Sequence, residues 1–184
     1  MQFTELALPG CFEIMPTRHS DVRGSFVKVF HRDEFSQRGL VGEWPEEYYS
    51  VSAPGVVRGL HFQVPPQDHA KLVYCVAGEV LDGLVDVRIG SPTYGRHLAL
   101  ALSAEKANLV YLPSGIAHGF AVRAGSATLV YRTSTVHSPS CDSGIRWDSA
   151  GIPWGIDTAI VSPRDAQLPA LADFRSPFTY RKQP

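Results

Sequence analysis

The hydrophobic positions in the central part of the chain fall into short runs that have the length and composition of β-strands. These runs are rich in Val, Leu, Tyr and Phe, and over residues 84–89 apolar and charged side chains alternate, as on a strand with one buried face. Clusters of glycine, proline and serine between the runs are typical of turns. The runs expected to form strands are residues 72–76, 80–89, 97–102, 108–112, 120–123 and 127–133.

Many short strands at regular spacing predict an all-β fold, a sandwich or barrel, for which a double-sheet jelly roll is the expected form. Helices are expected only as short stretches near the two ends of the chain. One covers residues 33–38, and another begins at Ser162, where serine can cap a helix and Pro163 fits its first turn. The sequence has no internal repeat and no linker, so we expect one domain over residues 1–184.

The composition narrows the class of protein. Hydrophobic residues make up 44% of the chain and charged residues 19%, which is typical of a globular domain. The formal net charge is −1, so neither nucleic acid nor an anionic membrane is expected as a partner. The cysteines Cys11, Cys75 and Cys141 are odd in number and lack metal-ligand spacing, which indicates reduced thiols. With no visible secretory signal or membrane-spanning run, we expect a cytoplasmic protein.

Several polar residues with catalytic potential stand inside the apolar runs. Arg58 and His61 belong to the segment RGLHFQ, Lys71 begins an apolar run, and Tyr131 stands within another. On a regular strand Arg58 and His61 would face opposite sides, whereas a bulge near Gly59 would bring them into one cavity. Taken singly, each residue has a more ordinary interpretation, such as a hydrogen-bonded core histidine or a solvated lysine at a strand edge.

The order and spacing of four long segments change this picture. GVVRGLHFQ, KLVYCVAGEVLDGLVDVRIGSPTYG, LPSGIAHGF and GIRWDSAGIPWGI followed by VSPRD resemble the dTDP-4-dehydrorhamnose 3,5-epimerase family. With DVRGSF near the start, the resemblance runs from about residue 21 to residue 165. It implies a cupin-type jelly roll, a homodimer with an exchanged N-terminal strand, and no metal or other cofactor. The implied reaction is epimerisation of a nucleotide-linked 4-keto-6-deoxyhexose at C3, with C5 left open.

The resemblance also assigns roles to individual residues. It places the catalytic base on His61, the carboxylate that orients this base on Asp165, the opposing acid on Tyr131 and the active-site lysine on Lys71. Among the substrate-binding residues, Arg23 is expected to reach the nucleotide bound by the neighbouring subunit, and Phe26 to stack on its base. The full set expected to bind the substrate is Arg23, Phe26, Lys28, Arg58, Gln63, His118 and His137.

The chemistry of a proton next to a ketone explains why these residue types are needed. Removal of a proton from C3 or C5 gives an enolate, so the reaction requires a base, and a histidine oriented by a carboxylate can serve near neutral pH. A lysine already in place can stabilise the charge that develops on O4. Because inversion returns the proton to the opposite face of the ring, a second group, here a tyrosine, must stand across the sugar.

Three places in the sequence, five residues in all, depart from the family pattern. His137 stands where a second tyrosine is usual, Lys28 replaces a glutamate, and Glu46-Glu47-Tyr48 replaces Gln-Asp-Asn. Lysine only donates hydrogen bonds, so it cannot accept from the N–H of thymine but suits a carbonyl such as that of cytosine. The alternative is that Lys28 points to solvent. We hypothesise a C3-selective epimerase whose nucleotide need not be dTDP.

Three other functions fit parts of the pattern. A metal-dependent cupin enzyme would use His61, His69, Glu79 and His118 as ligands, but Gln63 stands where a second histidine would share a strand face with His61. A non-catalytic sugar-nucleotide-binding cupin would have lost the base or the acid, and both are kept. An isomerase that moves the ketone would share the enolate, and only its product would distinguish it.

Overall fold

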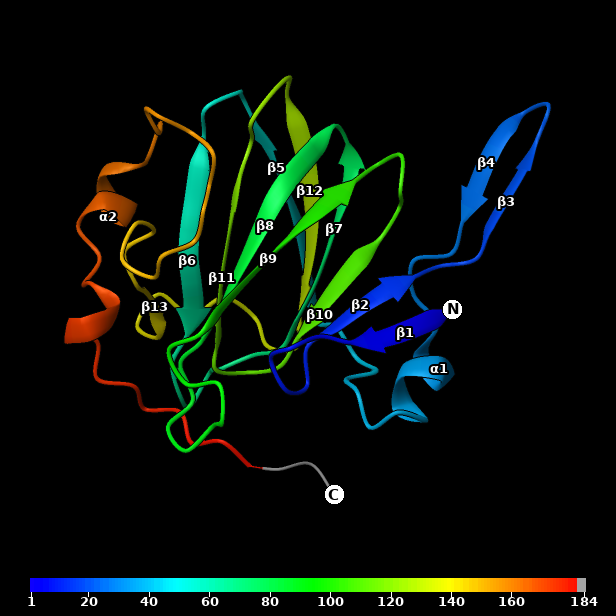
Figure 1. The fold of residues 1–184 in the computed structure, drawn as a ribbon. Coiled ribbons are helices and arrows are strands. Elements are labelled where there is room, and N and C mark those ends of the chain that lie inside the picture. The colour runs from blue at the N-terminus through cyan, green and yellow to red at the C-terminus, as the bar shows by residue number, and fades with distance from the viewer. Residues whose placement is uncertain (182–184) are drawn as a thin grey trace.

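The computed structural model describes residues 1–181, which form two packed antiparallel sheets and a projecting hairpin (Figure 1). The six-stranded sheet has the order β1 (Gln2–Glu5), β2 (Phe12–Met15), β10 (Leu109–Leu112), β7 (Lys71–Ala77), β12 (Ala127–Thr133) and β5 (Glu46–Ser52). The five-stranded sheet has the order β13 (Asp142–Gly144), β6 (Val57–Gln63), β11 (Ile116–Ala121), β8 (Glu79–Asp86) and β9 (His97–Ser103). The all-β jelly roll predicted from the sequence is therefore confirmed.

The hairpin consists of β3 (Arg18–Asp21) and β4 (Gly24–Val27), which pair with each other and extend away from the two sheets (Figure 1). All of its residues except Val27 are exposed, and the apolar side chain of Val22 stands fully in solvent at its tip. An apolar residue at the tip of a projecting hairpin is a feature that contact with another molecule would cover.

Helices are few and short, as predicted. The first, α1, covers Arg32–Ser36, the second, α2, covers Pro163–Ala166, and a 3-10 helix covers Leu171–Asp173. The start of α2 follows the predicted chemistry, because the Ser162 hydroxyl accepts a hydrogen bond from the backbone N–H of Asp165 at 3.1 Å. No helix within residues 1–181 is long and apolar enough to cross a membrane.

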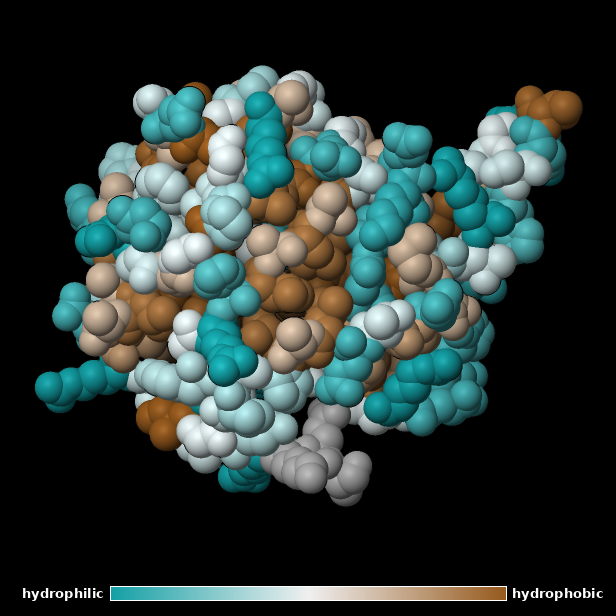
Figure 2. Space-filling view, viewed as in Figure 1, coloured by the Kyte–Doolittle hydropathy of each residue, from teal (hydrophilic) through white to brown (hydrophobic). Residues whose placement is uncertain are grey.

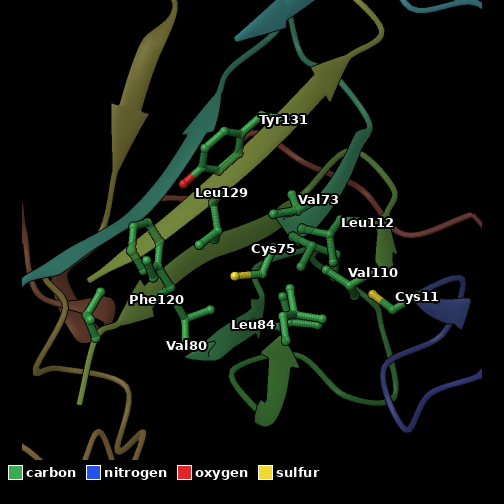
Figure 3. Close-up of a cluster of buried hydrophobic side chains, with 14 of the residues drawn as sticks. Cys11, Val73, Cys75, Val80, Leu84, Val110, Leu112, Phe120, Leu129 and Tyr131 are labelled. Atoms are coloured by element: carbon green, nitrogen blue, oxygen red, sulfur yellow. The ribbon is translucent and has the colours of Figure 1, made fainter. Parts of the chain in front are cut away.

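The space between the sheets is filled by side chains from both inner faces. Leu129 and Val73 from the six-stranded sheet meet Phe120 and Leu84 from the five-stranded sheet, and all four are buried (Figure 3). Tyr131 lies at the border of this cluster (Figure 3). On the outside of the molecule, apolar side chains gather over the area of β8 and β9 (Figure 2). The three cysteines are buried and free.

One predicted strand was placed wrongly and another extended too far. Residues 120–123 were expected as a strand, but β11 spans Ile116–Ala121 and all six of its residues are buried. A strand that pairs with a neighbour on both sides and is covered on both faces shows no alternation, so its first half read as an isolated polar stretch. The expected strand 80–89 ends at Asp86, whose carboxylate accepts the backbone N–H of Arg88 at 3.0 Å and begins a turn.

Candidate active site

A cavity of about 420 Å³ lies between the two sheets. His61 and His118 reach it from the five-stranded sheet, whereas Lys71 and Tyr131 reach it from the six-stranded sheet. The family resemblance assigned catalytic or substrate-binding roles to these four residues, and the structure brings them together around one cavity. Side chains on opposite sheets can act on opposite faces of a molecule held between them.

A bulge in β6 aims two of the lining residues. His61 pairs with His118 of β11, and Arg58 pairs with Phe120, so three steps along β6 match two along β11. This extra residue gives Arg58 and His61 the same side of the strand, as the sequence analysis suggested. Gly59 within the bulge has φ +128, and a Cβ atom there would lie 2.5 Å from the Gly119 Cα. Only glycine fits such a position.

His61 and Asp165 form a hydrogen-bonded pair at the edge of the cavity. Nε2 of His61 lies 2.7 Å from Oδ1 of Asp165, and the other carboxylate oxygen accepts the backbone N–H of Gly59 at 3.1 Å. An ionised carboxylate only accepts, so Nε2 carries the proton and Nδ1 keeps a free lone pair. The imidazole is partly accessible, with 27% of its side chain exposed, whereas the carboxyl is 4% exposed.

Burial and the contact between the two side chains together determine the pKa values of this pair. Burial lowers the pKa of His61, while the hydrogen bond that His61 donates to Asp165 opposes that effect and the charges of Lys71 and Arg164 add to it. Burial would raise the pKa of Asp165, but the hydrogen bond and charge of His61 hold it below its ordinary value. The pair is therefore a neutral imidazole beside a carboxylate at neutral pH, which is the state a general base requires.

Arg164 and Asp142 lie beside this pair and were not identified from the sequence. Nη2 of Arg164 lies 2.6 Å from the Asp142 carboxylate, and Nη1 lies 3.3 Å from Nε2 of His61. Both Nη1 and the protonated Nε2 are donors, so this second contact is not a hydrogen bond in the tautomer fixed by Asp165. The guanidinium thus stands at the cavity with its charge partly balanced by Asp142.

Lys71 supplies a buried cation. Its residue is 6% exposed, and Nζ donates to the backbone carbonyl of His61 at 3.1 Å. Burial lowers the pKa of Lys71 to about 8, with the charges of Asp142 and Asp82 acting in the opposite direction. An ammonium group in this position remains charged at neutral pH and has further donors to offer an oxygen in the cavity.

Tyr131 supplies a buried phenol on the side of the cavity opposite His61. Its hydroxyl lies 3.2 Å from the Ser50 hydroxyl, and its ring is stacked on Tyr48. Burial raises the pKa of Tyr131 far above its ordinary value, so the phenol holds its proton. A phenol that keeps its proton until a carbanion forms beside it can act as an acid. Ser50 was not identified from the sequence, and Tyr48 was noted there only as part of a segment that departs from the family pattern.

A second histidine–aspartate pair lies at the wall of the cavity, where His118 lines the cavity and Asp82 does not. Nε2 of His118 lies 2.7 Å from Oδ2 of Asp82, and both side chains are almost completely buried. Among residues 1–181 the other carboxylate oxygen, Oδ1, has no hydrogen-bond partner. Burial raises the pKa of Asp82, while the charge and hydrogen bond of His118 oppose it. His118 lines the cavity, as expected, but its Nε2 is committed to a carboxylate that the sequence analysis did not select.

Three further candidates for substrate binding also line this cavity. Arg58 donates from Nε to the Ser52 hydroxyl at 3.0 Å, and the backbone N–H of His137 donates to Glu46 at 2.7 Å. The amide of Gln63 is occupied by the protein, because it donates to the Gln67 carbonyl at 2.6 Å and accepts the Ser138 N–H at 2.6 Å. This geometry fits a side chain that braces the neighbouring loop.

The remaining candidates, on the β3–β4 hairpin and just after it, do not reach the cavity of their own chain. The Arg23 side chain is 86% exposed and paired with Asp21, and Phe26 is 62% exposed. Lys28, directly after β4, lines a separate small pocket with Phe26 and Glu34. A single chain therefore leaves the expected nucleotide-binding residues away from the expected catalytic residues.

The geometry does not assemble the ligand set of the alternative metal site. Glu79 is exposed at the start of β8, and Nε2 of His118 is held by Asp82. Burial lowers the pKa of His69 to about 3, with Lys71 and His137 adding to the effect. Within residues 1–181, no three His, Cys, Asp or Glu side chains are arranged to hold a metal ion.

Nearly the whole chain is similar to known proteins of one family. The family model described as dTDP-4-dehydrorhamnose 3,5-epimerase matches residues 5–173. A dTDP-4-dehydrorhamnose 3-epimerase of Streptomyces niveus is 38% identical over 178 residues, covering 95% of this chain and 86% of the relative. A dTDP-4-dehydrorhamnose 3,5-epimerase of Shigella flexneri is 36% identical over 168 residues, covering 90% of this chain and 93% of the relative.

A solved structure shares the whole arrangement of the chain. It is a dTDP-6-deoxy-D-glucose-3,5-epimerase of Legionella pneumophila in complex with dTDP-4-keto-L-rhamnose. The two structures superpose with a TM-score of 0.93 at 30% sequence identity, covering 98% of this chain and 99% of that one.

Proposed function

Because the chain belongs to the dTDP-4-dehydrorhamnose 3,5-epimerase family, we propose that it is an epimerase that inverts C3 of a nucleotide-linked 4-keto-6-deoxyhexose. The observation that carries the proposal is the placement of an oriented histidine and a protonated tyrosine on opposite sheets of one cavity, with a buried lysine beside them. The relatives include both a 3-epimerase and a 3,5-epimerase, so inversion at C3 is the activity their names share.

In the proposed first step, Nδ1 of His61 removes the proton from C3. The electron pair of the broken C–H bond forms the C3–C4 double bond, and the carbonyl pair moves to O4. Asp165 stabilises the imidazolium that results, because its carboxylate already accepts the proton on Nε2. Lys71 donates to the enolate oxygen, and its ammonium needs no reorganisation to do so.

In the proposed second step, the Tyr131 hydroxyl protonates C3 from the other face and the ketone re-forms. The phenolate that remains is next to the Ser50 hydroxyl, which can donate to it. The proton left on His61 and the proton lost by Tyr131 then equilibrate with water, so the enzyme returns to its starting state. In heavy water this sequence leaves one deuterium at C3 for each inversion.

The proposed substrate carries dTDP, since the relatives that match the chain are named for dTDP-linked sugars. Arg58, Arg164 and Lys71 give the cavity cations that a sugar diphosphate can contact. A CDP-linked sugar is the second substrate to be tested, because Lys28 stands where the family usually has glutamate and lysine can donate to the cytosine carbonyl. Comparable rates with both nucleotides would show that Lys28 does not discriminate between them.

We further propose that two copies form a homodimer in which each hairpin completes the partner's site. The exposed positions of Arg23 and Phe26 and the solvent-exposed Val22 at the hairpin tip support this arrangement. Exchange of the projecting hairpins would bring the expected nucleotide-binding residues of each chain to the cavity of its partner. The buried free thiols support a cytoplasmic location.

The test is deuterium wash-in from heavy water with dTDP- and CDP-linked 4-keto-6-deoxyglucose. Wild-type protein should place label at C3 with inversion, and His61→Ala should reduce that exchange by about a thousandfold while the fold is retained. A non-catalytic binding protein would bind the nucleotide sugar without exchange. An isomerase that moves the ketone would release a 3-keto product, which carbon NMR distinguishes from an inverted 4-keto sugar.

A further inference from the structure

Tyr48 lies against the proposed acid on the wall of the cavity. It stands on β5 directly opposite Tyr131 on β12, so the two side chains share one face of the sheet. Their rings are stacked, with centroids 4.9 Å apart and planes inclined by 15°. A stacked aromatic neighbour restricts the rotation of a ring that has only two side-chain torsions. Tyr48 therefore holds the ring of Tyr131 in one orientation.

Two other contacts complete the restraint on Tyr131. Its hydroxyl lies 3.2 Å from the Ser50 hydroxyl, and its ring packs against the His118 ring in a T-shaped arrangement, with centroids 6.0 Å apart and planes inclined by 75°. With its hydroxyl in contact with Ser50 and its ring packed between Tyr48 and His118, Tyr131 can deliver its proton to only one region of the cavity.

Tyr48 also takes up space at the mouth of the cavity. It is 43% exposed and lines the cavity together with Glu46 and His137. Burial of its hydroxyl, with the carboxylates of Glu46 and Asp142 adding to the effect, raises the pKa of Tyr48 to about 12. The side chain is thus a neutral aromatic wall at neutral pH. Such a wall reduces the room in which a bound sugar ring could turn.

The geometry of the sugar gives this wall a consequence for specificity. C3 and C5 lie on opposite sides of C4, so a fixed acid reaches both carbons only if the ring turns within the cavity. We propose that Tyr48 is a specificity-determining residue that restricts the enzyme to C3, because it fixes Tyr131 and fills the space in which the ring would turn. This inference rests on the proposed function, since it assumes the proton transfers described above.

The test compares the ratio of deuterium at C5 to deuterium at C3 in three variants. Tyr48→Asn removes the stack and opens the mouth, and should raise the C5 to C3 ratio about tenfold. Tyr48→Phe keeps the ring and should keep the wild-type ratio. Tyr49→Asn is the matched control, because Tyr49 is the next residue on β5 but points outward and is 69% exposed. It should change neither the ratio nor the rate.

The outcomes separate this inference from the function on which it rests. If the wild-type enzyme labels neither carbon, the proposed function fails. If it labels C3 and C5 equally, the function stands and the role of Tyr48 is overturned. An unchanged ratio in Tyr48→Asn also overturns it, and so does the loss of all exchange in that variant, which would make Tyr48 part of the chemistry itself. Gel filtration and thermal unfolding of each variant establish that the fold is intact.

Discussion

The two histidine–aspartate pairs of the cavity are alike in distance and different in surroundings. In each, a histidine Nε2 lies 2.7 Å from a carboxylate oxygen, and the two histidines are cross-strand neighbours on β6 and β11. The His61 side chain is 27% exposed, however, and the His118 side chain 3%. Burial acts to raise the pKa of both aspartates, yet the net effect is a lowered pKa for Asp165 and a raised pKa for Asp82.

This difference supports the proposed assignment of the base to the His61 pair. Asp165 has a second donor in the Gly59 backbone, which stabilises its ionised form. Asp82 carries an oxygen that has no partner within residues 1–181, so its charge is costly and its histidine is tied in place. The accessible pair can bind a proton from a substrate, whereas the buried pair supports the wall of the cavity. The same residue types thus serve two purposes.

The largest expected effect comes from changing the two carboxylates separately. Asp165→Asn keeps the shape but lets the amide favour the wrong tautomer of His61, so the rate of exchange at C3 should fall about a thousandfold. Asp82→Asn should reduce the rate much less, because Asp82 does not line the cavity. Initial rates by proton NMR in heavy water give both values. Equal losses in the two variants would remove the distinction between the pairs.

For stability, in contrast to the rate, we expect the larger loss from a change in the buried pair. His118→Ala leaves a buried carboxylate without its partner and should lower the free energy of unfolding by about 3–5 kcal/mol. In His61→Ala, Asp165 keeps its hydrogen bond from the Gly59 N–H, and solvent can reach the place of the partly exposed imidazole. The free energy of unfolding should therefore fall by less than about 1 kcal/mol. Urea unfolding followed by fluorescence provides the comparison. A larger loss for His61→Ala would contradict it.

Features set by adjacent residues could be predicted from the sequence, whereas contacts between distant residues could not. The start of α2 could be predicted because Ser162 and Pro163 act on their own helix turn. His61 and Asp165 are 104 positions apart, and no local pattern links them, so they were paired through the family resemblance alone. Asp82 escaped notice because one carboxylate in an alternating strand looks like a solvent-facing residue. The local sign of its burial was that Asp82 is the one charged residue in the run from Val80 to Val85.

The pH dependence is the smallest of the three effects. The proposed base, His61, works when it is neutral, and burial lowers its pKa, so activity should fall only on the acidic side of the ordinary histidine range. Lys71 works when charged, and its pKa of about 8 should set the alkaline limit. We expect a bell-shaped pH profile of kcat/KM. In Lys71→Ala the rate should be much lower at every pH, and the alkaline limb of the profile should be absent. A limb that stays at the same pH in this variant would assign it to another group.

The most direct test of the central claim, that a proton leaves to His61 and returns from Tyr131 on the other face, is a single variant in heavy water. Tyr131→Phe should still let His61 exchange the C3 proton, because its imidazole and Asp165 are untouched, and the deuteron should return to the same face. The predicted result is recovered substrate that carries deuterium at C3 with its configuration retained, and little inverted product. Inversion at the wild-type rate in Tyr131→Phe would contradict the account.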